Sequence, residues 1–150
     1  MPRVDSVPVY KGDGELGRFE VLRLSDAGEL TQFGAVVETL WPGGKSSKAH
    51  WHLNEDEMVY MLEGEAILVE GENESRLMAG EAACFKAGVE IGHHLENRTN
   101  DPIRYLVIGT RSNDELVTYT RDGSTVATKD GVKTYRDSNG VITSTKLVER

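Results

Sequence analysis

The feature that most constrains the fold of this chain is a succession of short strand-like runs, each closed by turn-forming residues. Runs rich in β-branched and aromatic residues lie at 33–41, 57–62, 66–69, 82–85, 93–97 and 103–108. Between them stand turn-forming clusters such as Pro42-Gly43-Gly44 and Asn100-Asp101-Pro102. No window shows the sustained apolar period of about 3.6 residues that is typical of an amphipathic helix. This pattern predicts an all-β sandwich or barrel with few, short helices.

The composition is that of one globular domain with no nucleic-acid partner. The chain has 150 residues, of which 38% are hydrophobic and 28% are charged, so it can bury a core. It carries 25 acidic and 17 basic residues, which gives a net charge of −8. An acidic chain repels phosphate backbones, and no face is rich in lysine and arginine. We therefore expect no binding to nucleic acid.

The sequence also predicts a cytoplasmic protein with no membrane segment. No run approaches the roughly 18 apolar residues that a membrane-spanning helix needs. The first residues lack the apolar stretch of a signal peptide. The single cysteine, Cys84, cannot form an internal disulfide, which favours a reducing compartment. Because Cys84 stands between Ala83 and Phe85, we expect it to be a buried, unreactive thiol.

The four histidines fall in two short clusters, and the first of them predicts a metal site. His50 and His52 are two residues apart, so on an extended strand their side chains point to the same face. Glu57 follows five residues later, close enough for a turn to bring it beside them on the next strand. Two imidazoles and a carboxylate form an incomplete ligand set for a divalent metal. The only other histidines are His93 and His94.

The spacing around the first cluster resembles a known family motif. The chain reads Gly44-x5-His50-x-His52-x4-Glu57-x6-Gly64. This is similar, position for position, to the first motif of the cupin family. The spacing includes both histidines, the glutamate and the two flanking glycines, which makes the resemblance highly specific.

A second stretch resembles the second cupin motif, which usually reads Gly-x5-Pro-x-Gly-x2-His-x3-Asn. This chain has Gly80-x5-Lys86-Ala87-Gly88-x4-His93-x3-Asn97. It departs from the family pattern in two ways: Lys86 replaces the usual proline, and two extra residues precede the histidine. The His-x3-Asn ending is kept only if His93 is the ligand. The resemblance therefore assigns that role to His93 rather than to the histidine that follows it.

The resemblance implies a jelly-roll barrel, the double-stranded β-helix of small single-domain bacterial cupins. We expect one domain over 1–150, with the barrel core at about 31–111. Residues 112–150 form a polar C-terminal extension, paced by the hairpin-type dipeptides Asp122-Gly123, Asp130-Gly131 and Asn139-Gly140. The extension has too few large apolar residues for a core of its own. We expect it to add β-hairpins or an extended arm to the barrel.

The ligand set implied by the resemblance is His50, His52, Glu57 and His93, binding one divalent transition metal. Three nitrogens and one oxygen suit Fe, Mn, Zn, Ni, Co or Cu, so the ligands do not select the metal. In an octahedral site, four protein ligands leave two positions for water, substrate or dioxygen. Glu57 is also the expected catalytic residue, as a carboxylate that releases the metal to take a proton. No other cofactor is expected.

Four further residues are candidates for binding the substrate. Val59 and Met61 share the strand parity of Glu57, so we expect them to line the barrel interior and to make part of the pocket apolar. Lys86 is placed to meet an anionic substrate at the barrel mouth, although a solvated loop lysine is the more frequent case. Asn97 shares the parity of His93 and is expected to hold a water or to orient a ligand.

Two classes of function fit these features. The first is a metalloenzyme that acts on a small oxygenated metabolite. The cupins it resembles include sugar and sugar-phosphate isomerases, decarboxylases, lyases and dioxygenases, so the family leaves the reaction open. The alternative is a non-catalytic module that binds a small molecule or a metal as a sensor or carrier. A metal analysis and a test for metal-dependent ligand binding would separate the two.

The strand that begins at Glu57 also predicts the assembly. Met58, Tyr60 and Leu62 form a second apolar face, opposite the one that we expect to line the barrel. An exposed apolar face needs cover, and cupins of this size are commonly dimers. We therefore expect a homodimer with a small-molecule ligand.

Overall fold

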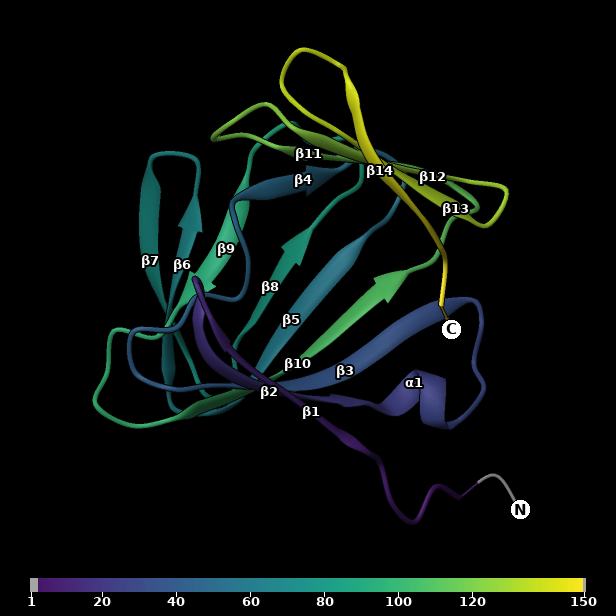
Figure 1. The fold of residues 1–150 in the computed structure, drawn as a ribbon. Helices are drawn as coiled ribbons and strands as arrows, with labels where there is room; N and C mark the ends of the chain where they lie inside the picture. The colour runs from purple at the N-terminus through teal and green to yellow at the C-terminus, as the bar shows by residue number, and fades with distance from the viewer. Residues whose placement is uncertain (1–2, 150) are drawn as a thin grey trace.

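The computed structural model describes residues 3–149, which form two antiparallel sheets that face each other as a barrel (Figure 1). One sheet has six strands, in the order β1 (Val9–Gly14), β2 (Gly17–Arg23), β3 (Phe33–Leu40), β10 (Ile103–Thr110), β5 (Glu57–Glu63) and β8 (Ala82–Phe85). The other has eight, in the order β14 (Ile142–Leu147), β13 (Val132–Arg136), β12 (Thr125–Lys129), β11 (Asp114–Tyr119), β4 (His50–His52), β9 (His93–Glu96), β6 (Glu65–Glu70) and β7 (Asn73–Met78).

Nearly all of the regular secondary structure is strand, which confirms the predicted all-β jelly roll. The one helix among residues 3–149 is α1 (Leu24–Ala27), which lies between β2 and β3. With four residues, it is far too short to cross a membrane. Helices are therefore few and short, as the lack of a 3.6-residue apolar period predicted.

The hydrophobic core lies between the two sheets. Ten buried side chains form it: Leu40, Val59, Met61, Ala66, Leu68, Leu77, Ala83, Leu95, Ile103 and Tyr105. Strand β5 shows how the alternation places them, because successive side chains of a strand point to opposite faces. Val59 and Met61 are 4% and 0% exposed, whereas Tyr60 and Leu62 on the outer face are each 39% exposed. The predicted parity of this strand is confirmed.

The reversal between β5 and β6 depends on a glycine of the first motif. Gly64 adopts φ +82°, a backbone conformation that is costly for residues with a Cβ atom. A Cβ atom there would also lie 2.7 Å from Cγ2 of the buried Ile103. The motif glycine is therefore required by both the turn and the packing beneath it.

The C-terminal extension is built into the barrel. Strands β11 to β14 form successive antiparallel hairpins, which agrees with the predicted hairpins. The first of them, β11, pairs with β4, and the register sets Val117 opposite His52 and Tyr119 opposite His50. Figure 1 shows these strands continuing one sheet of the barrel. The extension thus contacts the strand that carries the first two predicted ligands.

One prediction about the core was wrong: Cys84 is exposed, not buried. It lies on β8, where the inward positions are taken by Ala83, 7% exposed, and the half-buried Phe85. Cys84 pairs in register with Met58 and shares its outward face. Small apolar neighbours in the sequence predict burial only when the strand alternation agrees, and here it places the thiol on the opposite face.

Candidate metal centre

The predicted ligands converge from three strands. His50 and His52 come from β4, Glu57 is the first residue of β5, and His93 is the first residue of β9. Strands β4 and β9 pair with His50 opposite His93, which brings the two histidine clusters together. The ring centre of His50 lies 5.0 Å from that of His52 and 4.9 Å from that of His93. Tertiary structure thus gathers residues that are up to 43 positions apart in the sequence.

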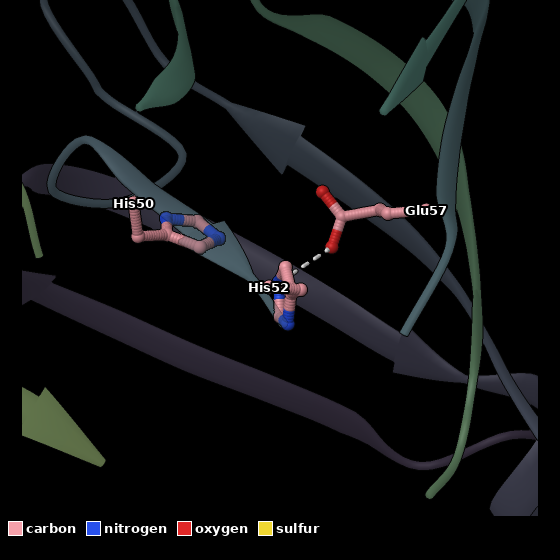
Figure 2. A group of neighbouring side chains, drawn as sticks. All are labelled: His50, His52 and Glu57. Carbon is pink, nitrogen blue, oxygen red and sulfur yellow. Dashed lines mark ion pairs between the residues drawn. The ribbon is translucent and has the colours of Figure 1, made fainter. Parts of the chain in front are cut away.

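The carboxylate of Glu57 lies between two of the rings. Its Oε2 is 3.4 Å from Nε2 of His52, and its Oε1 is 3.2 Å from Nε2 of His93. Figure 2 shows the carboxylate directed toward His52, with His50 beside it. Donor atoms of His50, His52 and Glu57 all lie within 4.8 Å of one another, as ligands of a single ion must. His93 borders this group through its contact with Glu57.

Two of the rings are held by further contacts. Nδ1 of His50 lies 2.8 Å from the carbonyl oxygen of Lys48. Because a carbonyl only accepts, Nδ1 carries the proton, and Nε2 keeps its lone pair for a metal. His93 is 5% exposed and stacks on Phe85, with the ring centres 3.6 Å apart and the planes at 2°. The stacking fixes the plane of the His93 ring.

Two features show that these residues fit a divalent metal: the chemistry of their donor atoms, and buried polar atoms that lack a hydrogen-bond partner among the described residues. Both ring nitrogens of His52 are buried, and neither makes a hydrogen bond of good geometry among the described residues. A buried polar atom without a partner costs roughly 1–3 kcal/mol. A metal on Nε2 would relieve one of these two costs, and nitrogen with carboxylate oxygen is a ligand set that transition metals accept.

The protonation states of the cluster are set by burial and by the mutual contacts. Burial lowers the pKa of His50, which keeps its imidazole neutral. Burial alone would lower the pKa of His52, but the contacts with Glu57 and then Glu115 outweigh it and raise the pKa. Burial would likewise raise the pKa of Glu57, but His52 and His93 hold it well below its usual range. The cluster therefore presents an ionised carboxylate.

Sequence reasoning missed Glu115, which lies on the other side of His52. Its Oε2 is 3.4 Å from Nδ1 of His52, and the residue is only 3% exposed. Glu115, Val117 and Tyr119 alternate along β11 and face the cluster. The two-residue spacing of Glu115, Val117 and Tyr119 was the one sequence pattern that pointed to this strand face. It indicated a strand but could not show that the strand pairs with β4.

A cavity of about 420 Å³ opens beside the cluster. One side is formed by His50, His52 and Glu57 and by the end of β10. The C-terminal extension supplies much of the remainder, through Glu115, Val117, Tyr119, Val126, Thr128, Lys133, Tyr135, Val148 and Glu149. The extension thus determines much of the shape and charge of the space next to the candidate metal ligands.

The structure places two of the predicted substrate-binding residues away from this cavity. Val59 and Met61 are buried as predicted, but they pack in the core and do not line the cavity beside the cluster. They lie two and four residues beyond Glu57 on β5, which carries them deeper between the sheets. We therefore assign them to packing.

Asn97 does not face the cluster, which corrects the expectation from its parity with His93. It is 1% exposed, and its amide nitrogen donates to the carbonyl oxygens of Leu40 and Asp101. Its side-chain oxygen accepts hydrogen bonds from the backbone nitrogen and the hydroxyl of Thr99. Asn97 keeps the inward parity of His93, and both are buried, but it lies four residues further along the chain, where it packs beside Leu40 and away from Glu57. Asn97 secures the loop instead.

Lys86, the last of the four predicted substrate-binding residues, and His94 do not line the cavity of about 420 Å³ beside the cluster. Lys86 is exposed and lines a smaller cavity of about 150 Å³, whose walls include His52 and His93. His94 points away from the cluster, and its Nε2 lies 2.9 Å from Oε1 of Glu96. Of the adjacent histidines, His93 is thus the one that contacts Glu57.

Comparison with known proteins agrees with this geometry. Residues 36–109 match the family model described as the cupin domain. A structure described as a sugar phosphate isomerase of the cupin superfamily from Silicibacter pomeroyi is 33% identical, with a TM-score of 0.83, and 96% of each chain is covered. The chain therefore belongs to the cupin superfamily. No curated protein matches it.

Two more distant structures share the fold. A sugar phosphate isomerase candidate from Acidithiobacillus ferrooxidans is 22% identical with a TM-score of 0.79, covering 93% of this chain and 88% of its own. A protein predicted to be an oxalate decarboxylase, from Thermotoga maritima, is 20% identical with a TM-score of 0.62, covering 75% of this chain and 99% of its own. At these identities the likeness concerns the fold alone.

Proposed function

We propose that this cupin binds one divalent transition metal through His50, His52, Glu57 and His93 and isomerises a small sugar phosphate. The observation that carries the proposal is the convergence of these side chains beside a cavity, with the buried nitrogens of His52 left without hydrogen bonds of good geometry among residues 3–149. The isomerase reading is favoured over a decarboxylase because the relative that is 33% identical over 96% of the chain is described as a sugar phosphate isomerase.

An aldose–ketose conversion suits such a site. It moves one proton between neighbouring carbons and one between their oxygens, so no oxidant or reductant is consumed. When bound, a divalent metal supplies a Lewis acid for the substrate oxygens. The protein contributes fixed imidazole and carboxylate groups and a cavity that limits the size of the substrate.

Glu57 is the residue we propose to carry the proton between the carbons. Burial alone would raise its pKa, but the contacts with His52 and His93 outweigh burial and hold the pKa low. Glu57 is therefore ionised at neutral pH. A carboxylate of such low pKa is a weak base. We propose that substrate binding releases one carboxylate oxygen from these contacts, which raises the pKa and makes the proton transfer easier.

The charges around the cavity indicate where a phosphate would bind. Five acidic residues line it: Glu55, Asp56, Glu57, Glu115 and Glu149. Its two lining cations among residues 3–149 are Arg111 and Lys133, and Arg111 is already paired with Asp26. We propose that Lys133 on β13 receives the phosphate. Lys86, at the smaller cavity on the other side of His52, is the second candidate.

The test begins with the metal. Protein purified without a nickel column is analysed by mass spectrometry for bound metals, and about one equivalent per chain is expected. Metal-loaded and metal-stripped protein are then incubated with aldose and ketose phosphates, and interconversion is followed by NMR. We expect turnover only in the loaded protein. Equal ligand binding by both forms without turnover would favour the non-catalytic sensor or carrier instead.

Variants then assign the roles. Glu57→Gln should keep part of the metal and lose most turnover, because an amide cannot take the proton. Lys133→Ala should raise KM for a sugar phosphate far more than for the unphosphorylated sugar, whereas Lys86→Ala serves as the comparison. If Lys86→Ala alone changes the KM for the phosphorylated substrate, the phosphate binds on the other side of His52.

A further inference from the structure

His52 is held between two carboxylates, one at each ring nitrogen. Its Nε2 faces Oε2 of Glu57 at 3.4 Å, on the side where the metal is proposed. Its Nδ1 faces Oε2 of Glu115, also at 3.4 Å, on the opposite side. Glu115 lies beyond residues 36–109, the part of the chain that matches the cupin model. The contact at Nδ1 is therefore supplied by the C-terminal extension.

Glu115 is fixed in place by its other oxygen. Its Oε1 accepts hydrogen bonds from the backbone nitrogens of Asn54 and Leu116, each at 2.8 Å. Its side chain is 2% exposed, and Oε2 is buried without a hydrogen-bond partner of good geometry among residues 3–149. A buried carboxylate oxygen needs a donor, and Nδ1 of His52 is the nitrogen it faces.

We propose that Glu115 is a positioning residue for the metal site: its Oε2 accepts a hydrogen bond from Nδ1–H of His52, which leaves Nε2 as the lone pair for the metal. The inference rests on the metal site of the proposed function. A carboxylate only accepts, so the contact selects the tautomer with the proton on Nδ1. At 3.4 Å the two atoms are slightly farther apart than in a good hydrogen bond of about 2.7–3.2 Å, so the proposed bond requires a small rotation of the His52 ring toward Glu115.

The other histidine of β4, His50, supports this proposal because its Nδ1 also faces a hydrogen-bond acceptor. Nδ1 of His50 lies 2.8 Å from the carbonyl oxygen of Lys48, which selects the same tautomer. Both histidines of β4 thus have an acceptor behind Nδ1 and point Nε2 toward Glu57 or toward the space beside it. For His50 the acceptor belongs to the backbone, whereas for His52 it comes from β11.

The variant Glu115→Gln gives a sharp test because the amide would reverse the contact. Its oxygen would keep the two backbone donors, Asn54 and Leu116, which leaves the NH₂ group facing Nδ1 of His52. The amide cannot turn over without setting its NH₂ against those two N–H groups. A donor at Nδ1 favours the proton on Nε2, which then no longer offers a lone pair to the metal.

The experiment uses Zn²⁺ as a diamagnetic probe on the full chain labelled with ¹⁵N. In the zinc-loaded wild type, the ¹⁵N shifts of His52 should show a protonated Nδ1 and a metal-bound Nε2. Zinc affinity, measured by competition with a chelator, should fall about 10–100-fold in Glu115→Gln, as is typical for loss of such a partner. A merely structural role of Glu115 would not move the ring-nitrogen shifts.

Glu55→Gln is the matched control. Donor atoms of His52, Glu55 and Glu115 lie within 4.8 Å of one another, so this change removes the same charge from the same corner. It leaves the acceptor at Nδ1 in place, and Glu55 is only partly buried, so the affinity should change by no more than about fivefold. If both variants lost zinc affinity equally, and each bound one zinc equivalent fewer than the wild type, the inference would be overturned in favour of a second cation at this corner.

The two proposals fail in different ways. If the wild type binds no zinc, the proposed metal site is wrong and the inference falls with it. If zinc binds but Nδ1 of His52 carries no proton, only the inference is overturned. This second measurement uses the wild type alone, so it decides the matter even if Glu115→Gln does not fold.

Discussion

His52 is the residue on which the proposed site depends most. Each of its ring nitrogens is buried and faces a carboxylate, Glu57 on one side and Glu115 on the other. Its position is set by β4, a strand of three residues. A change at this side chain should therefore affect the metal while leaving most of the barrel in place.

We predict that His52→Ala removes most of the bound metal and the stabilisation that the metal provides. A ligand that binds only the native state at 100 times its Kd adds about 2.7 kcal/mol. For a chain of this length, that corresponds to a rise in Tm of about 5–10 °C. The wild type should show this rise on adding metal, and His52→Ala should not, in thermal unfolding with and without the ion.

His94→Ala is the control for that experiment, since His94 contacts Glu96 and points away from the cluster. It should keep the metal and the metal-dependent rise in Tm. Loss of the metal in His94→Ala with retention in His93→Ala would show that the ligand had been assigned to the wrong histidine of the pair.

A second prediction at the residue scale concerns Glu38 on β3. Its Oε2 accepts a 2.5 Å hydrogen bond from the hydroxyl of the fully buried Tyr105. Burial raises the pKa of Glu38; the hydrogen bond lowers it, and repulsion from Glu57 adds to the rise, so the net shift is upward. A carboxyl group whose pKa is higher in the folded than in the unfolded state destabilises the fold once it ionises.

The sign of the pH dependence follows. Below about pH 4.3, the usual value for glutamate, Glu38 is protonated in both states and adds no destabilisation. As the pH rises through the raised pKa of the folded state, the free energy of unfolding falls. Glu38→Gln keeps an acceptor for Tyr105 without the charge, so it should be more stable than the wild type at pH 7.5 and show a smaller loss between pH 5 and 7.5 in urea unfolding.

Glu72→Gln, in the exposed loop between β6 and β7, removes the same charge far from the core and should leave this pH dependence unchanged. If Glu38→Gln were less stable than the wild type at both pH values, the carboxylate would be a net stabilising group and the prediction would be wrong.

At the scale of elements, β11 supports the strand that carries two of the candidate metal ligands. β4 pairs with β11 over three residues but with β9 at a single position, His50 with His93. Most of the backbone pairing of β4 therefore comes from the extension. The placement of both histidines depends on a strand that the family model does not include.

We predict that a chain ending at residue 111 loses metal binding and cooperative thermal unfolding. Without β11, the histidines of β4 have little to hold their strand, and the cavity loses one wall. Metal stoichiometry and the shape of the thermal transition report the result. A chain ending at residue 137 is the control. It removes the exposed edge strand β14 and the cavity-lining Val148 and Glu149 but keeps β11, so it should retain the metal. A truncation at 111 that still binds one metal would show that β4 is held without β11.

At the scale of the whole molecule, the outer face of the six-stranded sheet carries apolar side chains. Tyr60 and Leu62 are each 39% exposed on β5, and a shallow cavity of about 410 Å³ on the same face is lined in part by Met58, Cys84 and Ile108. Exposed apolar surface of this kind is typical of an interface. This is the face through which the homodimer predicted from the sequence would form.

We predict that sedimentation at micromolar concentration gives a dimer, with twice the 16.6 kDa mass of one chain. Leu62→Glu should shift it toward the monomer, because a charge in a dimer interface must be desolvated. Val141→Glu, at a 58% exposed position between β13 and β14, is the control and should leave the assembly unchanged. A wild type that sediments only as the single chain would reject the dimer.

The sequence by itself determined the fold class and the core of the candidate site. Strand alternation placed His50 with His52, and Val59 with Met61, on common faces, because a period of two is a local property of the backbone. The short turn between the two strands then brought Glu57 beside the histidines, all within the motif that runs from Gly44 to Gly64. These features depend on neighbours in the sequence, so a single sequence contains them.

Only the tertiary structure decided which distant residues meet those ligands. Glu115 reaches His52 because β11 pairs with β4, and that register is set by contacts between segments some 60 residues apart, which no local pattern encodes. The same reason explains Asn97, whose hydrogen bonds to Leu40 and Asp101 turn it away from the cluster. The sequence could name the candidate ligands, but the packing of the extension determined which residues contact them from β11.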